Sequence, residues 1–343
     1  MHFELILPGL DWPTGPGHHP ADDLALPTLS KLLGFSEAIW TPRSTPETLL
    51  AERFGLTDRL PHARFRRFGE RTPAPTDGHW LCCDPVHLHF SRDTLLLNDA
   101  GGLDITREEA DALMDGLNET FADIGHFEAP APDRWYVRLA AEPQPEFHPL
   151  ADVNGRPVQL FLPEGEDVPR WARLSNEIEV WLFSHPVNAA REERGQRTIN
   201  GVWLWGNGTA AASGSRPFAA LQADQPFARG LASHAGLSPA ATDHYHRPDG
   251  NGLALIDDLQ RPLLHMDREG WCRALRALET NWFAPLLSDL KTHKLEAIRI
   301  SVPNDRHTLQ LDVGSSGLWK FWRKPRTLGS VLATAPQPAA QTP

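Results

Sequence analysis

The chain has 343 residues, of which 41% are hydrophobic and 22% charged, and its formal net charge is −11 at pH 7. This length predicts one large or two moderate domains, with a core that needs no disulfide or metal to hold it. The acidic balance disfavours nucleic acid and anionic membranes as partners, and no segment is apolar enough to span a bilayer. The 3 cysteines include the adjacent pair Cys82 and Cys83, which favours a reducing, cytoplasmic location.

The first part of an α/β core is expected over residues 1–71. An apolar strand near the N-terminus leads into a loop that carries Asp11. Thr45 stands before an apolar helical pattern, which predicts a helix N-cap. The basic segment 62–71 is interpreted as a solvated arginine face, with an anion site or an acidic partner as the alternative.

Residues 77–147 break the alternation of strands and helices. Two apolar runs flank a polar turn at 91–93, the signal of a β-hairpin. Thr106 and Glu109 form a capping box before a helix, and another strand is expected over 134–139. This β-β-α-β order predicts an inserted subdomain.

The second part of the core is expected over residues 150–326 and begins with a long amphipathic helix. Asp167 is its expected N-cap, and Pro186 should bend or end it. Residues 202–205 lack alternation, so we predict a strand covered on both faces, as in a parallel sheet. The loop 206–208 would then lie at the sheet edge where ligands bind.

The best candidates for a ligand site lie around this loop. Some of them recur every third residue and so share one polar face of the helix, and the others flank the glycines of the loop. Together they are predicted to bind a phosphate or carboxylate. These candidates are His185, Asn188, Arg191, Trp205 and Asn207.

Two further strands complete the expected core. The first, over 252–256, ends at Asp257 and Asp258, and a long helix over 268–290 leads to the second, which ends before Asn304. Residues 327–343 are expected to be a disordered tail.

Several segments, taken in order, resemble a known family. These are LILPGLDWP, LALPTLSKLLGF, INGVWLWGNG, ARGLASHAGL, LALIDD and EAIRISVPNDRH. Their order resembles the cofactor-independent phosphoglycerate mutase branch of the alkaline-phosphatase superfamily. The segments WLCCDPVHLHFSRDTLLL and FSHPVNAAREERG resemble bacterial RpfE-type regulatory proteins. The resemblance implies a three-layer α/β fold, alkaline-phosphatase-like, with a mainly parallel sheet, helices on both faces and an inserted α+β subdomain.

The superfamily's chemistry implies two divalent metals and a serine or threonine nucleophile. Ser44 and Thr45 fall in the nucleophile region. Pro8 stands where the family has a ligand aspartate, and Pro262 stands where it has a ligand histidine. The side chains left as candidate metal ligands are Asp11, Asp257, Asp258, Asp305 and His307.

Three functions follow from this pattern. In the preferred one, the metal motifs are lost, no cofactor is expected, and the protein is a regulatory or ligand-sensing pseudoenzyme whose partner is a phosphorylated small molecule or a protein. In the second, a reduced site binds manganese or zinc, and the protein is a phosphoglycerate mutase-like isomerase or a phosphatase. In the third, it binds a partner through the inserted subdomain.

Overall fold

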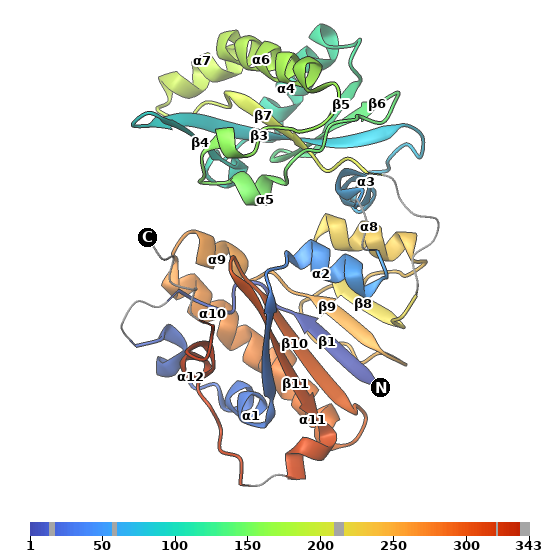
Figure 1. The fold of residues 1–343 in the computed structure, drawn as a ribbon, viewed down its shortest axis with the longest axis vertical. Helices are drawn as coiled ribbons and strands as arrows, with labels where there is room; N and C mark the ends of the chain where they lie inside the picture. Colours follow the sequence, from blue (N-terminus) through green and yellow to red (C-terminus); the bar gives the residue numbers. More distant parts are fainter. Residues whose placement is uncertain (14–17, 57–59, 209–215, 320–321, 337–343) are drawn as a thin grey trace. The chain divides into compact units, whose positions relative to one another are not determined.

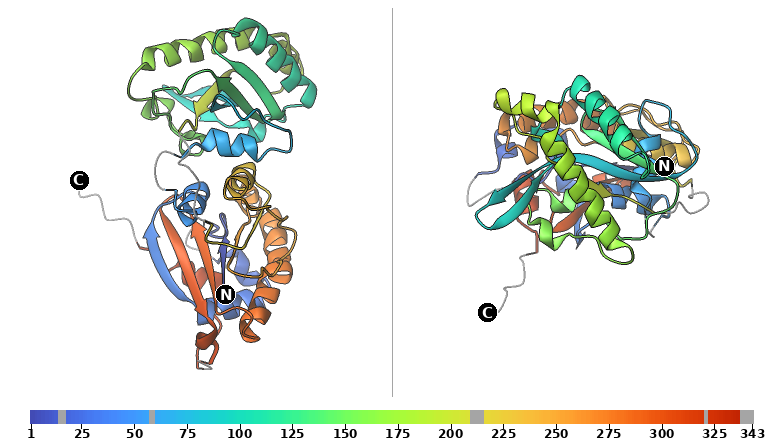
Figure 2. Two further views of the ribbon diagram at one scale, coloured as in Figure 1. Left: turned by 90° about the vertical axis from the view of Figure 1, so that its right-hand side faces the viewer. Right: turned by 90° about the horizontal axis from the view of Figure 1, so that it is seen from above.

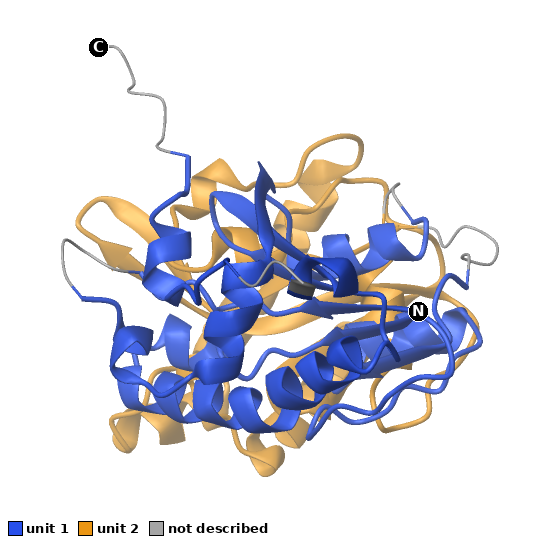
Figure 3. Cartoon of the chain, turned by 90° about the horizontal axis from the view of Figure 1, so that it is seen from below, with its two compact units in different colours: residues 1–56, 213–343 blue, residues 57–212 orange. Residues whose placement is uncertain are grey.

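The computed structural model describes residues 1–13, 18–56, 60–208, 216–319 and 322–336. The chain divides into two compact units, which are drawn in different colours in Figure 3. Residues 1–56 and 213–343 form the first unit, and residues 57–212 form the second. The second unit is therefore one continuous insertion between the two halves of the first.

The first unit is built on a six-stranded sheet in the order β2-β11-β10-β1-β9-β8 (Figure 1). The strands β10, β1, β9 and β8 are parallel to one another, whereas β11 pairs antiparallel with both β10 and β2. The predicted α/β class with a mainly parallel sheet is confirmed. The strands are β1 His2–Ile6, β2 Glu37–Pro42, β8 Ala220–Ala223, β9 Gly252–Leu255, β10 Ala297–Pro303 and β11 His307–Gly314.

Alternation along β1 gives the sheet of the first unit two different faces. Phe3 and Leu5 join the large apolar core under the long helical segment α10–α11, which runs along one face of the sheet (Figures 1 and 2). Glu4 points to the other face, where the Arg53 guanidinium of α2 donates to it at 2.8 Å. The helices are η1 Pro20–Asp23, α1 Pro27–Phe35, α2 Pro46–Arg53, α8 Pro226–His234, α9 Gln260–Leu264, α10 Arg268–Leu278, the π-turn η4 Glu279–Phe283, α11 Ala284–Lys291, η5 Ser315–Trp319 and α12 Leu328–Leu332.

The second unit is built on a five-stranded antiparallel sheet. The long strand β3 hydrogen-bonds to β6, β7 and β4 in turn along its length, and β5 pairs with β6. The strands are β3 His79–Ser91, β4 Thr94–Asn98, β5 His126–Ala131, β6 Arg134–Leu139 and β7 Gly201–Trp205. The helical segments are α3 His62–Phe68, η2 Ala100–Gly102, α4 Arg107–Thr120, α5 Leu150–Val153, η3 Val158–Leu160, α6 Val168–Ser184 and α7 Pro186–Glu193.

This division corrects the expected boundaries. The insertion spans 57–212 and not 77–147, because β7 pairs antiparallel with β3 of the same unit. The prediction that 202–205 form a strand of the parallel core sheet is therefore wrong. The apolar run correctly predicted that this strand is buried, but it did not predict which strand pairs with it.

Local signals were more accurate than long-range ones. The capping box at Thr106 and Glu109 is present, and Pro186 separates α6 from α7 as expected. Asp167 stands before α6, but its φ is 63° and its side chain caps no backbone group. Within the described ranges, no helix combines the length and apolar character needed to cross a bilayer.

The structure describes only part of the tail that was expected to be disordered. Residues 328–332 form the helix α12, whose Leu328 and Val331 are buried in the core of the first unit. The start of the tail is therefore ordered by apolar contacts, contrary to the prediction. Residues 337–343 lie outside the described part of the chain.

Candidate functional site

The carboxyl ends of four parallel strands bring acidic residues to one edge of the six-stranded sheet. Asp11 follows β1, Asp224 follows β8, Asp257 and Asp258 follow β9, and Asp305 follows β10. Ligands of open α/β sheets bind at this edge. The structure thus places four of the five predicted metal ligands on the expected side of the sheet.

Asp11 is the most perturbed carboxyl at this edge. Burial raises its pKa to about 7, and the negative charge of Asp305 adds to the effect. Hydrogen bonds from its own backbone amide and from the Asn304 side chain oppose the shift. A carboxyl that titrates near neutral pH beside a second carboxylate is typical of functional sites, although burial alone also produces it.

A second acidic group gathers around β8 and β9. The Gln225 side chain donates to Asp257 at 2.8 Å. Partial burial raises the pKa of Asp258, and the charges of Asp257 and Asp224 raise it further. A pocket of about 250 Å³ opens here, and its polar lining includes three carboxylates. The residues around it are Asp224, Ala241, Thr242, Asp243, Asp258, Ala277, Leu278, Asn281 and Trp282.

These carboxylates do not form one chelating cluster. Among the described residues, a single group of three has donor atoms that all lie within 4.8 Å of one another, and it contains none of the predicted ligands. The predicted five-residue metal site is split, with Asp11 near Asp305 and Asp257 near Asp258. His307 begins β11, and its ring packs edge-on against Trp40 at 6.2 Å.

That group of three is Asp243, His244 and His246, which the sequence analysis missed. The signal was present in the sequence as DHYH. Two histidines separated by one buried aromatic residue point to the same side of an extended segment.

The hydroxyls of the candidate nucleophiles, Ser44 and Thr45, contact backbone groups. The Thr45 hydroxyl accepts a hydrogen bond from the Thr48 amide at 3.1 Å and caps α2, as the alternative interpretation predicts. Ser44 Oγ lies 3.4 Å from the carbonyl oxygen of Thr45. Among the residues that the structure describes, neither hydroxyl hydrogen-bonds to a histidine or a carboxylate, the partners that activate such an oxygen as a nucleophile.

The predicted ligand face on α7 is internal. Arg191 is 0% exposed, and its guanidinium donates to Glu109 at 2.5 Å, to the Arg197 carbonyl at 2.8 Å and to the Leu103 carbonyl. Asn188 donates to two backbone carbonyls and accepts from the Ile199 amide at 2.8 Å.

Similar contacts account for the other members of the predicted ligand site. His185 caps α7 by accepting from the Val187 amide, and Asn207 donates to the carbonyls of Pro143 and Pro145. Gly206 has a φ of +83° and accepts from the Ala63 amide at the start of α3, where a Cβ atom would lie 3.0 Å from that nitrogen. The glycine loop therefore fits α3 against β7, Asn188 and Arg191 are buried, and a ligand site here stays a prediction.

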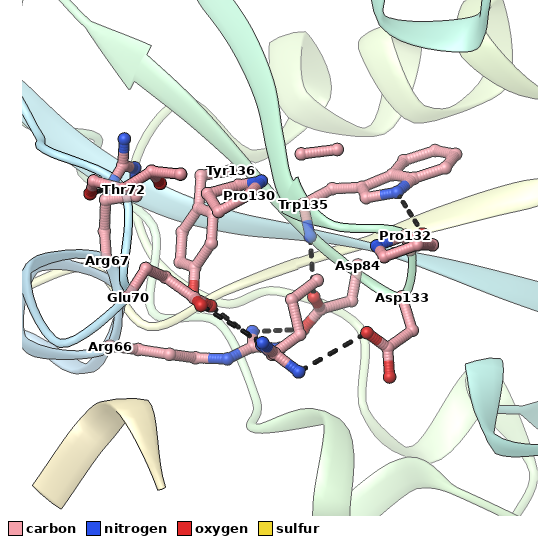
Figure 4. A network of polar contacts seen from close by, with 12 residues as sticks. Arg66, Arg67, Glu70, Thr72, Asp84, Pro130, Pro132, Asp133, Trp135 and Tyr136 are labelled. Carbon is pink, nitrogen blue, oxygen red and sulfur yellow. Dashed lines mark hydrogen bonds and ion pairs between the residues drawn. The ribbon is translucent and has the colours of Figure 1, made fainter. Parts of the chain in front are cut away.

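A polar network fixes α3 to the sheet of the second unit (Figure 4). Arg66 donates to Asp84 at 2.7 Å, and Asp84 also accepts from the Trp205 indole at 2.8 Å and from the Trp135 amide at 3.3 Å. Burial lowers the pKa of Arg66, but the charge and hydrogen bond of Asp84 together with the nearby Tyr136 and Cys82 outweigh it, so the net pKa lies above the ordinary value.

Glu70 and its partners extend this network. Glu70 pairs with Arg134 at 2.7 Å and accepts from the Tyr136 hydroxyl at 2.9 Å (Figure 4). Arg67 is 2% exposed and pairs with Glu128 at 2.7 Å. The basic segment 62–71 is therefore not the predicted solvated face. Burial raises the pKa of the nearby Cys82 thiol to about 12, which leaves it unreactive at neutral pH.

Comparison with known proteins finds that part of the chain is similar to phosphoglycerate mutases. No protein-family model matches the chain. It is 28% identical over 118 residues to the 2,3-bisphosphoglycerate-independent phosphoglycerate mutase of Methanosarcina mazei, covering 34% of this chain and 30% of that enzyme. It is 29% identical over 163 residues to mutase 2 of Methanothermobacter thermautotrophicus, covering 45% and 39%. The chain is a distant homologue of these mutases.

The similarity to the mutases covers only part of their length, and the similarity to a solved structure concerns the fold. The aligned part spans 30% and 39% of these two curated mutases. The solved structure of the PH0037 protein from Pyrococcus horikoshii has a TM-score of 0.53 and 16% identity, and the match covers 91% of this chain and 87% of that one. It supports the fold alone. The predicted relation to cofactor-independent phosphoglycerate mutases is confirmed at this distance, and the finer RpfE-type assignment stays a prediction.

Proposed function

We propose that the protein is a non-catalytic regulatory or ligand-sensing member of the phosphoglycerate mutase-like group. The separation of the candidate metal ligands carries this proposal. Phosphoryl transfer by two metals needs their ligands to converge, since the metals stabilise the attacking and leaving oxygens together. Here Pro8 and Pro262 replace two expected ligands, and Asp11 and Asp257 belong to separate acidic pairs.

The remaining functional groups support the same conclusion. Thr45, the candidate nucleophile, caps α2, so its hydroxyl already has a structural role. The edge carries several aspartates, and a bare phosphate ester would be repelled there unless cations accompany it. Of the two partners considered, a phosphorylated small molecule and a protein, the acidic edge therefore favours a protein or a ligand that brings positive charge.

The test is an assay of the purified full-length chain for phosphoglycerate mutase and generic phosphatase turnover, with and without added Mn²⁺ or Zn²⁺. We expect no turnover above that of a heat-inactivated sample. Metal-dependent turnover that disappears in an Asp257→Asn variant would overturn the non-catalytic proposal, because contaminating enzymes would not respond to that substitution.

An enzyme with a reduced metal site is the second candidate. Asp11 favours it, because its pKa of about 7, its hydrogen bond from Asn304 and the nearby charge of Asp305 indicate a protonatable carboxyl at the ligand-binding edge. If this candidate holds, Asp11→Asn and Asp305→Asn should each abolish turnover, whereas substitution of the exposed Asp249 should not. Turnover that survives both substitutions would contradict it.

Partner binding through the inserted unit is the third candidate. Val180 and Phe183 on α6 are 72% and 85% exposed, beside an open groove between α6 and the end of α4. Exposed apolar clusters mark interaction sites in many soluble proteins. A partner captured by the wild type should be lost with Val180→Ser/Phe183→Ser and kept with a Glu193→Ser control.

The RpfE-type assignment and a cytoplasmic location are part of the same proposal. All three cysteines are free and buried, as a reducing cytoplasm would leave them. Measuring free thiols in protein extracted under rapid alkylation tests the location, and disulfide-linked Cys272 in that sample would contradict it.

A further inference from the structure

The loop between α8 and β9 carries an exposed group of metal-binding side chains. One donor atom from each of Asp243, His244 and His246 lies within 4.8 Å of the other two. The side chains are 66%, 55% and 49% exposed. They lie outside the set of ligands that the mutase resemblance predicts.

The backbone of this loop is held from several sides. The buried Tyr245 donates through its hydroxyl to Asp289 at 3.1 Å and through its amide to the Asn281 carbonyl at 3.0 Å. Gln222 of β8 donates to the His244 carbonyl at 2.8 Å and accepts from the His246 amide at 3.0 Å. Because Tyr245 points inward, the histidines on either side of it point outward, and their ring centroids lie 4.1 Å apart.

The start of the loop is fixed as well. Asp224 accepts from both the amide and the hydroxyl of Thr242, at 3.1 and 2.5 Å. The Trp282 indole donates to the Thr242 carbonyl at 3.1 Å. Preorganised ligands lose little conformational freedom when they bind a metal, which favours affinity.

The distances within the group suit a small divalent ion. Asp243 Oδ2 lies 2.8 Å from His244 Nδ1, and Asp243 Oδ1 lies 3.9 Å from His246 Nε2. Two ligands bound at about 2.0–2.1 Å to one tetrahedral zinc ion stand roughly 3.3–3.4 Å apart. The observed separations, which involve different oxygens of Asp243, lie on either side of that value, and side-chain rotation that replaces the hydrogen bond to His244 would bring the donors to one ion.

We propose that Asp243, His244 and His246 form a binding site for a first-row transition metal of the zinc class. Two imidazoles and one carboxylate favour such ions over Mg²⁺, which prefers oxygen ligands. Three protein ligands leave at least one coordination position for water or an anionic oxygen. Asp243 also lines the pocket that contains Asp224 and Asp258, so a bound ion would add positive charge to this acidic region.

The experiment is isothermal titration of the chelator-treated full-length chain with ZnCl₂ and, separately, MgCl₂. We expect Zn²⁺ to bind in preference to Mg²⁺. The variant His244→Gln/His246→Gln should weaken Zn²⁺ binding by at least about tenfold, since even the outer-shell partners of metal ligands contribute that much. Cobalt absorption spectra should show tetrahedral or five-coordinate bands in the wild type that are absent from this variant.

The controls separate this site from the others. His265→Gln removes an exposed histidine of the same unit, and Asp11→Asn/Asp305→Asn removes the strand-end pair; both variants should bind Zn²⁺ as the wild type does. Equal Zn²⁺ affinity in the wild type and the histidine variant would overturn the proposal. So would Zn²⁺ binding that depends only on Asp11 and Asp305. If the double variant melts at a lower temperature without zinc, Asp243→Asn replaces it under the same criteria.

Discussion

Replacing Asp11 with asparagine removes an ionisable carboxyl while keeping its shape and its ability to accept hydrogen bonds. Burial raises the pKa of this group from 3.8 to about 7. The shift of about three units corresponds to at most ~4 kcal/mol, since one unit is worth about 1.4 kcal/mol. Partial solvent access lowers the expected value to about 2–4 kcal/mol.

The sign follows from proton linkage. Between pH 4 and pH 7 the folded chain holds a proton on Asp11 that the unfolded chain has released, so the wild type loses stability as the pH rises. The Asn variant lacks this loss. We therefore expect the variant to be more stable than the wild type at pH 8, with a difference that grows by about 2 kcal/mol from pH 5 to pH 8.

Urea denaturation with a chelator present, followed by tryptophan fluorescence at several pH values, measures this difference. The exposed Asp249→Asn variant is the matched control and should change stability by no more than about 0.5 kcal/mol at any pH. A difference for Asp11→Asn that does not vary with pH would refute the reasoning. If added Mn²⁺ reverses the difference, Asp11 binds metal, and the enzyme candidate gains support.

Three further substitutions test contacts described above by the same denaturation assay. Arg191→Met should cost about 3–5 kcal/mol, because it breaks a buried ion pair with Glu109, which keeps only Arg194, and takes the donor from two backbone carbonyls. Thr45→Ala should cost about 1 kcal/mol and Thr45→Ser much less, because serine can also cap α2. Glu279→Gln should cost about 1–2 kcal/mol, since the Glu279 carboxylate accepts from the amides of Thr28 and Leu29 at the start of α1.

Each of these has a contradicting outcome. If the Arg191→Met variant were as stable as the wild type, the Arg191 side chain would not be buried in solution. Equal losses for alanine and serine at position 45 would exclude the cap as the cause. A Glu279→Gln variant as stable as the wild type would show that one uncharged acceptor suffices at the start of α1.

The sequence predicted those elements whose signals are local. The capping box of Thr106 and the cap of Thr45 depend on residues three positions apart, so a short segment contains all the information. The α/β class followed from apolar strands alternating with helices. The sheet that β7 joins could not be read in this way, because its partner β3 lies more than a hundred residues earlier and an apolar run specifies only burial.

The candidate site shows the same limit. The strand-end aspartates were found because strand ends are readable in sequence, but their separation into two pairs depends on packing between distant segments. Arg191 was taken for a ligand-binding residue because helical spacing cannot distinguish an outward arginine from one paired internally with Glu109, 82 positions away. Asp243, His244 and His246 were missed although their spacing was readable.

The insertion of one unit into the other also dictates an order of events during synthesis. Residues 57–212 form a continuous segment that is complete when it leaves the ribosome, whereas β1 must wait for β9, its first partner to be synthesised, since Phe3 pairs in register with Gly252. At a synthesis rate of about 5–20 residues per second, that wait lasts roughly 12–50 s. The apolar N-terminal strand therefore stays unpaired while the second unit is already able to fold, and it is a natural segment for a chaperone to hold. A chain truncated before β9 would lose the partners of β1 and retain the whole inserted unit.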